Sequence, residues 1–216
     1  MTARTRRVRF VPRAASYPLV AALFCGGCVP QPKADPTRFY LLIPIAPAAK
    51  GPAAPEEIFR VRLKEVELPA YLQSKSLAVR SRATEVVYEE FHRWAEPLDE
   101  GIARVLAKDL SALSDGKWMV RSRDSAAPDF EIALRITACE GVKDAEETGS
   151  SSFGATWEVT AIRAQGSAAV KRGVFEAAPA AWDGRDYGAL VERLSLALAE
   201  LARKIDGILE EAPRGE

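Results

Sequence analysis

Two long segments whose apolar residues recur at helical spacing constrain the fold of this chain more than any other feature. The first predicts a helix that begins near Glu96-Pro97 and ends at Ser114-Asp115-Gly116, since proline suits a first helical turn and glycine suits a helix end. The second predicts a longer helix over about 186–211. Each helix carries one apolar stripe that must be buried against another layer. The stripes are Leu98, Ile102, Val105, Leu106, Leu110 and Leu113, and Tyr187, Leu190, Val191, Leu194, Leu198, Leu201, Ile205 and Ile208.

The segments around these helices predict the sheet that would cover the stripes. Residues 59–64 and 130–137 alternate apolar and polar side chains with period two, which is typical of half-buried strands. Shorter strands are predicted at 39–43, 77–81, 85–89, 118–120, 156–164 and 168–175, whereas the acidic and Gly/Ser-rich segment 143–154 predicts a loop. We therefore expect an α+β fold in which a mostly antiparallel or mixed sheet has the two amphipathic helices packed on one face.

The N-terminal 28 residues have the pattern of an exported lipoprotein. Five arginines precede an apolar run at 14–24, which is shorter than the roughly 20 residues of a membrane-spanning helix. Gly26 and Gly27 then precede Cys28, and a lipoprotein signal places a cysteine at the first mature position, where its thiol receives a diacylglyceryl group. The sequence predicts a signal peptide over 1–27, lipidation of Cys28, a tether over 28–37 and a single domain over 38–212.

A redox or metal pair is the competing interpretation of Cys25 and Cys28. Such a pair needs a surrounding βαβ pattern or a second pair of ligands. The only other cysteine is Cys139 and the only histidine is His92, so we predict no metal site and no cofactor. Cys25 is also a poor lipidation site, because the bulky Phe24 precedes it.

Charge and motif content argue against nucleic-acid binding and catalysis. Removing residues 1–27 leaves 216 − 27 = 189 residues with 30 − 5 = 25 basic and 30 acidic side chains, a net charge of −5, whereas phosphate binding needs clustered basic residues. The run GSSSFG at 149–154 has Phe153 where a nucleophile elbow requires glycine, and His92 stands alone in an aromatic segment. We predict no catalytic residue, and a hydrolase is the weakest alternative.

The most distinctive run is EFHRWAEPLDEGI, residues 90–102, and it resembles the ABC-transport auxiliary lipoprotein family, which includes the PqiC type. Three further segments agree with this family: Tyr40-Leu41-Leu42, the Leu-Pro-x-Tyr-Leu turn at 68–72, and the Asp-Tyr-x-x-Leu-Val opening of the last helix at 186–191. The resemblance therefore covers most of the mature chain.

The resemblance implies a docking role in lipid transport. Such proteins accompany ABC systems with MCE-domain subunits, which move lipids between the inner and outer membranes of diderm bacteria. We expect a non-catalytic periplasmic component that binds an MCE-domain protein, with a second copy of the chain as a further possible partner. Val29 is not the Asp of an inner-membrane retention signal, so we expect the outer membrane. A regulator or assembly factor of peptidoglycan synthesis or of outer-membrane biogenesis is the alternative.

Three residues of this run are candidates for partner binding: Phe91, Arg93 and Trp94. Trp94 belongs to neither helix stripe and stands between Arg93 and Glu96, which could form a surface ion pair. Two interpretations of the aromatic residues stay open at this stage: an exposed docking anchor, or plain packing in the core.

The lipoprotein assignment predicts that Cys28→Ala abolishes incorporation of a radiolabelled fatty-acid precursor and leaves the protein uncleaved or soluble. Three acyl chains anchor a protein stably, so their loss should be evident on membrane fractionation. Cys25→Ala is the matched control and should retain full labelling in the outer-membrane fraction. Undiminished labelling of the Cys28 variant would contradict the assignment.

Overall fold

A computed structural model describes residues 34–45, 57–121, 127–143, 148–163 and 166–212 of the chain. The predicted signal peptide, Cys28 and most of the tether lie outside these residues. The described elements belong to one compact unit that begins at Pro36. In chain order they are β1 (Arg38–Tyr40), β2 (Phe59–Leu63), the 3₁₀ turn η1 (Ala70–Gln73), β3 (Ser76–Arg82), β4 (Glu85–Trp94), α1 (Leu98–Leu113), β5 (Trp118–Arg121), β6 (Phe130–Lys143), β7 (Gly149–Arg163), β8 (Gly166–Glu176), β9 (Ala180–Trp182) and α2 (Tyr187–Glu211).

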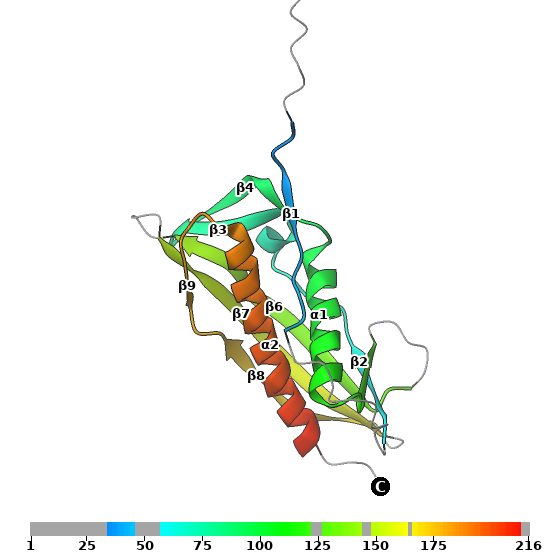
Figure 1. Cartoon of the computed structure of the whole chain (residues 1–216). Coiled ribbons are helices and arrows are strands. Elements are labelled where there is room, and N and C mark those ends of the chain that lie inside the picture. The colour runs from blue at the N-terminus through cyan, green and yellow to red at the C-terminus, as the bar shows by residue number, and fades with distance from the viewer. Residues whose placement is uncertain (1–33, 46–56, 122–126, 144–147, 164–165, 213–216) are drawn as a thin grey trace, which may run out of the picture. The chain divides into compact units, whose positions relative to one another are not determined.

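The long strands β6 and β7 form the centre of a mixed sheet (Figure 1). They pair antiparallel from Phe130 opposite Ala161 to Lys143 opposite Gly149. On the other side of β7 lie β8 and β9. On the other side of β6, β2 pairs in parallel with one end of the strand and β3 with the other end. Strand β5 extends the sheet beyond β2, and β4 followed by β1 extends it beyond β3.

Both helices lie on the same face of this sheet, which confirms the expected α+β architecture (Figure 1). Their predicted stripes form the core between the layers, together with alternating residues of β6 and β7. Ile102, Leu106 and Leu198 have no exposed surface. In the described part of the chain, neither helix has the length and apolar character to cross a membrane.

The loop predicted over 143–154 is wrong for the residues that the structure describes there, because β6 extends to Lys143 and β7 already begins at Gly149. Glycine occurs here because the strands pack closely. A Cβ atom at Gly149 would lie 2.0 Å from the Val142 carbonyl oxygen, and one at Gly154 would lie 2.5 Å from Thr137 Oγ1. A Gly/Ser-rich composition can therefore mark a crowded strand as well as a loop.

Strand β4 runs five residues beyond the predicted end at residue 89, as far as Trp94. Its pairing with β3 passes from Ala78 opposite Tyr88 to Ser76 opposite Arg93, so β4 carries (93 − 88) − (78 − 76) = 3 extra residues at this point. This irregularity interrupts the period-two pattern from which a strand is recognised. Beyond it, β1 pairs in parallel with the end of β4, with Tyr40 opposite Trp94.

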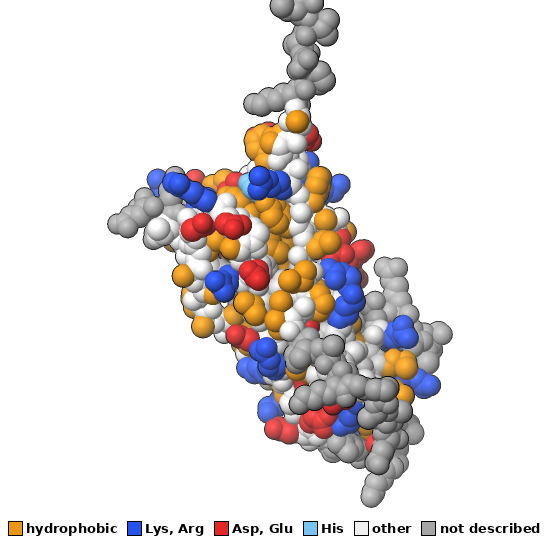
Figure 2. All heavy atoms as spheres, viewed as in Figure 1, with side chains coloured by type: hydrophobic (Ala, Val, Ile, Leu, Met, Phe, Trp, Pro, Cys, Tyr) orange, Lys and Arg blue, Asp and Glu red, His pale blue; other side chains and the backbone are white. Residues whose placement is uncertain are grey.

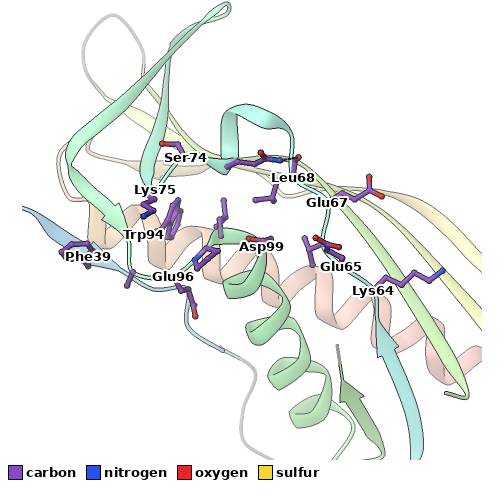
Figure 3. A pocket seen from close by; sticks show the side chains of 15 residues that line it. Phe39, Lys64, Glu65, Glu67, Leu68, Ser74, Lys75, Trp94, Glu96 and Asp99 are labelled. Atoms are coloured by element: carbon purple, nitrogen blue, oxygen red, sulfur yellow. Dashed lines mark hydrogen bonds between the residues drawn. The ribbon is translucent and has the colours of Figure 1, made fainter. Parts of the chain in front are cut away.

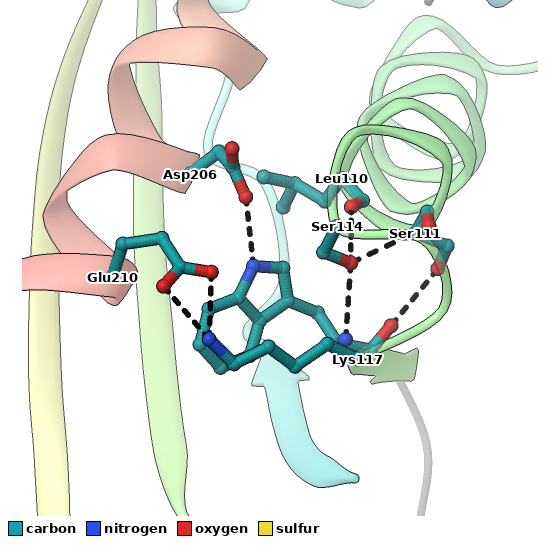
Figure 4. A network of polar contacts seen from close by, with 7 residues as sticks. Leu110, Ser111, Ser114, Lys117, Asp206 and Glu210 are labelled. Carbon is teal, nitrogen blue, oxygen red and sulfur yellow. Dashed lines mark hydrogen bonds and ion pairs between the residues drawn. The ribbon is translucent and has the colours of Figure 1, made fainter. Parts of the chain in front are cut away.

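A polar network joins the start of β5 to both helices (Figure 4). The Trp118 indole nitrogen donates a hydrogen bond of 2.8 Å to Asp206 Oδ1 on α2, and the Trp118 amide donates one of 3.1 Å to Ser114 Oγ at the end of α1. Lys117 forms an ion pair of 2.7 Å with Glu210. Burial raises the pKa of the Asp206 carboxyl, and the hydrogen bond from Trp118 opposes that rise.

We predict that Trp118→Phe destabilises the fold more at pH 7 than near pH 4. Because the pKa of Asp206 is raised in the folded state, this carboxyl stabilises the fold less as pH rises above the ordinary pKa of aspartate. Loss of the hydrogen bond from the Trp118 indole raises the pKa of Asp206 further, so the folded state loses still more stability at pH 7. The loss of unfolding free energy caused by the substitution should be about 1–3 kcal/mol larger at pH 7 than near pH 4, which is the contribution of a hydrogen bond to a charged group. Chemical denaturation measures it, and the difference should vanish in an Asp206→Asn background.

Candidate functional site

A cavity of about 1010 Å³ lies between two connections of the chain (Figure 3). One is the connection between β2 and β3, and the other is the junction of β4 with α1. Three segments supply most of its lining: residues 64–68, 73–75 and 94–99. Trp94 and Lys75 lie on one side, Glu65 and Glu67 lie on the other, and Asp99 lies between them (Figure 3). The cavity therefore includes the Trp-Ala-Glu-Pro-Leu-Asp part of the distinctive run at 90–102.

The cavity combines an apolar floor with an acidic rim. The apolar lining includes Val66, Leu68, Trp94 and Leu98. Of its charged residues, Glu67, Glu96 and Lys64 form ion pairs with Arg135, Arg104 and Glu131, which leaves the carboxylates Glu65 and Asp99 against the cation Lys75. Such a site favours an apolar group that carries neighbouring positive charge.

Glu96 is held in this rim by Arg104, one of the residues that the sequence did not identify. The two side chains form an ion pair of 2.5 Å, and Arg104 Nη2 also donates a hydrogen bond of 2.9 Å to the Leu42 carbonyl. Gly101 leaves room for the carboxylate, because a Cβ atom at that position would lie 3.0 Å from Glu96 Oε1. The expected pair between Arg93 and Glu96 is wrong: Arg93 Nε donates to the Glu90 carbonyl at 3.2 Å.

The structure separates the three residues predicted to bind a partner. Trp94 is a wall of the cavity and only 8% exposed, which favours the packing interpretation of this ring over an exposed docking anchor. The cause is the extension of β4, which places Trp94 in the sheet beside Tyr40. Phe91 is 43% exposed and Arg93 is also exposed, and neither lines the cavity.

His92 and the serine run at 149–154, which were considered for catalysis, lie outside the cavity. A hydrogen bond of 2.8 Å joins His92 Nδ1 to Tyr40 Oη. The His92 ring also stacks on Tyr187, with 3.9 Å between the ring centroids. Burial lowers the pKa of His92. Ser151 is buried in β7, where its hydroxyl accepts a hydrogen bond of 3.4 Å from the Ala180 amide. Over the described ranges, no three His, Cys, Asp or Glu side chains are grouped as metal ligands.

We predict that Trp94→Ala costs about 3–5 kcal/mol of unfolding free energy, as truncation of a buried tryptophan does. Phe91→Ala on the same strand is the matched control, and its exposed ring should cost less than about 1 kcal/mol. Chemical denaturation of both variants measures the difference. A Trp94 variant as stable as the Phe91 variant would show that the indole does not support the core.

Comparisons with known proteins agree with the fold described above. A family model for the ABC-type transport auxiliary lipoprotein component matches residues 40–206. Protein XCC0632 from Xanthomonas campestris, a DUF330 protein, is similar with a TM-score of 0.63 and 15% identity over 79% of this chain and 93% of that one. An uncharacterized protein of known crystal structure has a TM-score of 0.59 and 17% identity over 80% and 98%. Among curated proteins, none matched. The family match spans more than half of the sequence, and the chain belongs to the ABC-type transport auxiliary lipoprotein family.

Proposed function

We propose that the protein is a non-catalytic docking subunit, anchored in the outer membrane, of an ABC system that moves lipids between the two membranes with an MCE-domain protein. The observation that carries this proposal is the place of the distinctive run. Residues 94–99 of the run form one wall of a cavity with an apolar floor and an acidic rim. The part of the chain that carries the family resemblance is thus also a surface suited to binding.

The cavity suits a projecting side chain of the partner. Binding energy at protein interfaces concentrates in a few aromatic or aliphatic anchors that fill pockets. The apolar faces of Val66, Trp94 and Leu98 offer such a pocket, and the acidic excess favours basic residues beside the anchor. We infer that the partner presents an apolar residue with Lys or Arg next to it. Trp94 then contributes as a pocket wall, whereas Phe91 and Arg93 lie outside the cavity.

The anchor would hold this surface in the periplasm. Cys28 lies outside the described residues, and the lipidation that we propose there rests on the signal pattern at residues 1–28. Val29 supports the outer membrane as the destination. A protein fixed there and bound to an MCE assembly would contribute a physical connection between the transporter and its target membrane, while other subunits carry out ATP hydrolysis.

The proposed acidic rim predicts opposite effects for two substitutions. Glu65→Lys should weaken retention of the MCE-domain protein about two- to fivefold, since rim charges contribute up to about 1 kcal/mol. Lys75→Glu makes the cavity more acidic and should leave retention equal or stronger. Both side chains are exposed, so neither change should affect the melting temperature. Co-purification from detergent-solubilised membranes measures retention.

Glu200→Lys is the matched control, because it makes the same charge change on the exposed side of α2. It should retain the partner as the unsubstituted protein does. Equal loss with Glu65→Lys and Glu200→Lys would show only a general charge effect. Full retention with Glu65→Lys would exclude the cavity as the docking site.

A further inference from the structure

Three large apolar side chains form a row on the extended segment that starts at β1. Phe39, Leu41 and Ile43 are 65%, 47% and 46% exposed, whereas Leu42 is only 2% exposed. Successive side chains of an extended segment point to opposite sides, so the three exposed residues share one side. Figure 2 shows hydrophobic side chains gathered along the course of this segment. Contiguous apolar groups of this kind mark interaction surfaces on soluble domains.

The row is held outward by bonds to both helices. The Ile43 amide donates a hydrogen bond of 3.1 Å to Ser195 Oγ on α2, and the Ile45 amide donates one of 3.0 Å to Asp109 Oδ1 on α1. Ser195 and Asp109 are themselves fully buried. These contacts fix the backbone with Leu42 in the core. The outward side chains cannot become buried unless the segment leaves the helices.

The end of β4 adds positive charge to the same side. Phe39 lies opposite Arg93 in the parallel pair of β1 and β4. His92 stacks on Tyr187 of α2 and so lies on the helix side of the sheet, and its neighbour Arg93 lies on the side of Phe39. Arg93 is exposed, whereas Arg38 is paired with His92 and lies on the helix side. Aromatic rings beside basic groups are the composition of surfaces that lie at the level of lipid headgroups.

The length of chain before the row limits how far it can lie from a lipid anchor. Phe39 follows Cys28 by 39 − 28 = 11 residues. Fully extended, this stretch reaches at most about 38 Å. We infer that Leu41 and Ile43, together with Phe39 at the edge of the cavity, contact the headgroup region of the phospholipid membrane that holds the acyl chains of Cys28. This inference rests on the proposed anchoring.

Site-specific fluorescence on the mature lipidated protein tests the contact. Leu41→Cys carries an environment-sensitive label in vesicles of phosphatidylethanolamine and phosphatidylglycerol. Cys139 does not compete for the label, because it is 1% exposed and burial raises the pKa of its thiol to about 12. We expect blue-shifted emission and several-fold stronger quenching by nitroxide lipids than for a label at Glu200→Cys on α2. Ile43→Cys should repeat the result in a second variant of the same row.

Each remaining outcome overturns the inference. A shift at residue 41 that follows protein concentration without lipid quenching would show that a second copy of the chain covers the row. A shift that arises only when the MCE-domain protein is added would show that this protein covers it. Incorporation of a fatty-acid precursor reports the anchor separately. Acylated protein with equal quenching at residues 41 and 200 overturns this inference alone, and protein without acylation overturns the proposed anchoring as well.

Discussion

The antiparallel pairing of β6 with β7 is the contact on which the rest of the domain depends. These strands of 14 and 15 residues are the longest in the sheet, and the remaining strands are arranged along their two outer sides. Both helices cover the same face of this pair, so the apolar residues of the strands and the helix stripes share one core. A long central hairpin can accept different neighbours at its two ends, which allows a small domain to form a wide sheet.

The cavity follows from this arrangement. Strand β2 pairs with the start of β6 and β3 pairs with its end, so the chain between them must leave the sheet edge over residues 64–75. The bridge between Glu67 and Arg135 keeps part of this connection beside β6, and η1 then turns it toward β3. The junction of β4 with α1 faces the same connection across the cavity. Loops supported by a rigid scaffold are frequent places for binding sites.

Periodicity in the sequence predicted the helices and the regular strands well. Their buried side chains recur at regular spacing, every three or four residues in the helices and every second residue in the strands. Both helices begin and end within about two residues of the predicted positions. The remaining strand residues were missed because irregular pairing breaks this spacing. A register shift near Thr137 disrupts the alternation of β6, and beyond it Cys139, Glu140 and Gly141 are all buried. For the site, the sequence identified the run at 90–102, but Arg104 and the opposite wall at 64–68 meet it only through the tertiary fold.

The attachment of residues 38–45 also determines how the domain responds to mechanical force. A pull on the chain that precedes β1 acts along the strand, while its hydrogen bonds to β4 lie across it, so these bonds are loaded together in shear. The contacts of Ile43 and Ile45 with α2 and α1 lie further along the same segment and share the load. Such a geometry resists tension better than one in which bonds open one at a time. Tension along the N-terminal segment would therefore act on the pairing of β1 with β4 and on both helix contacts together.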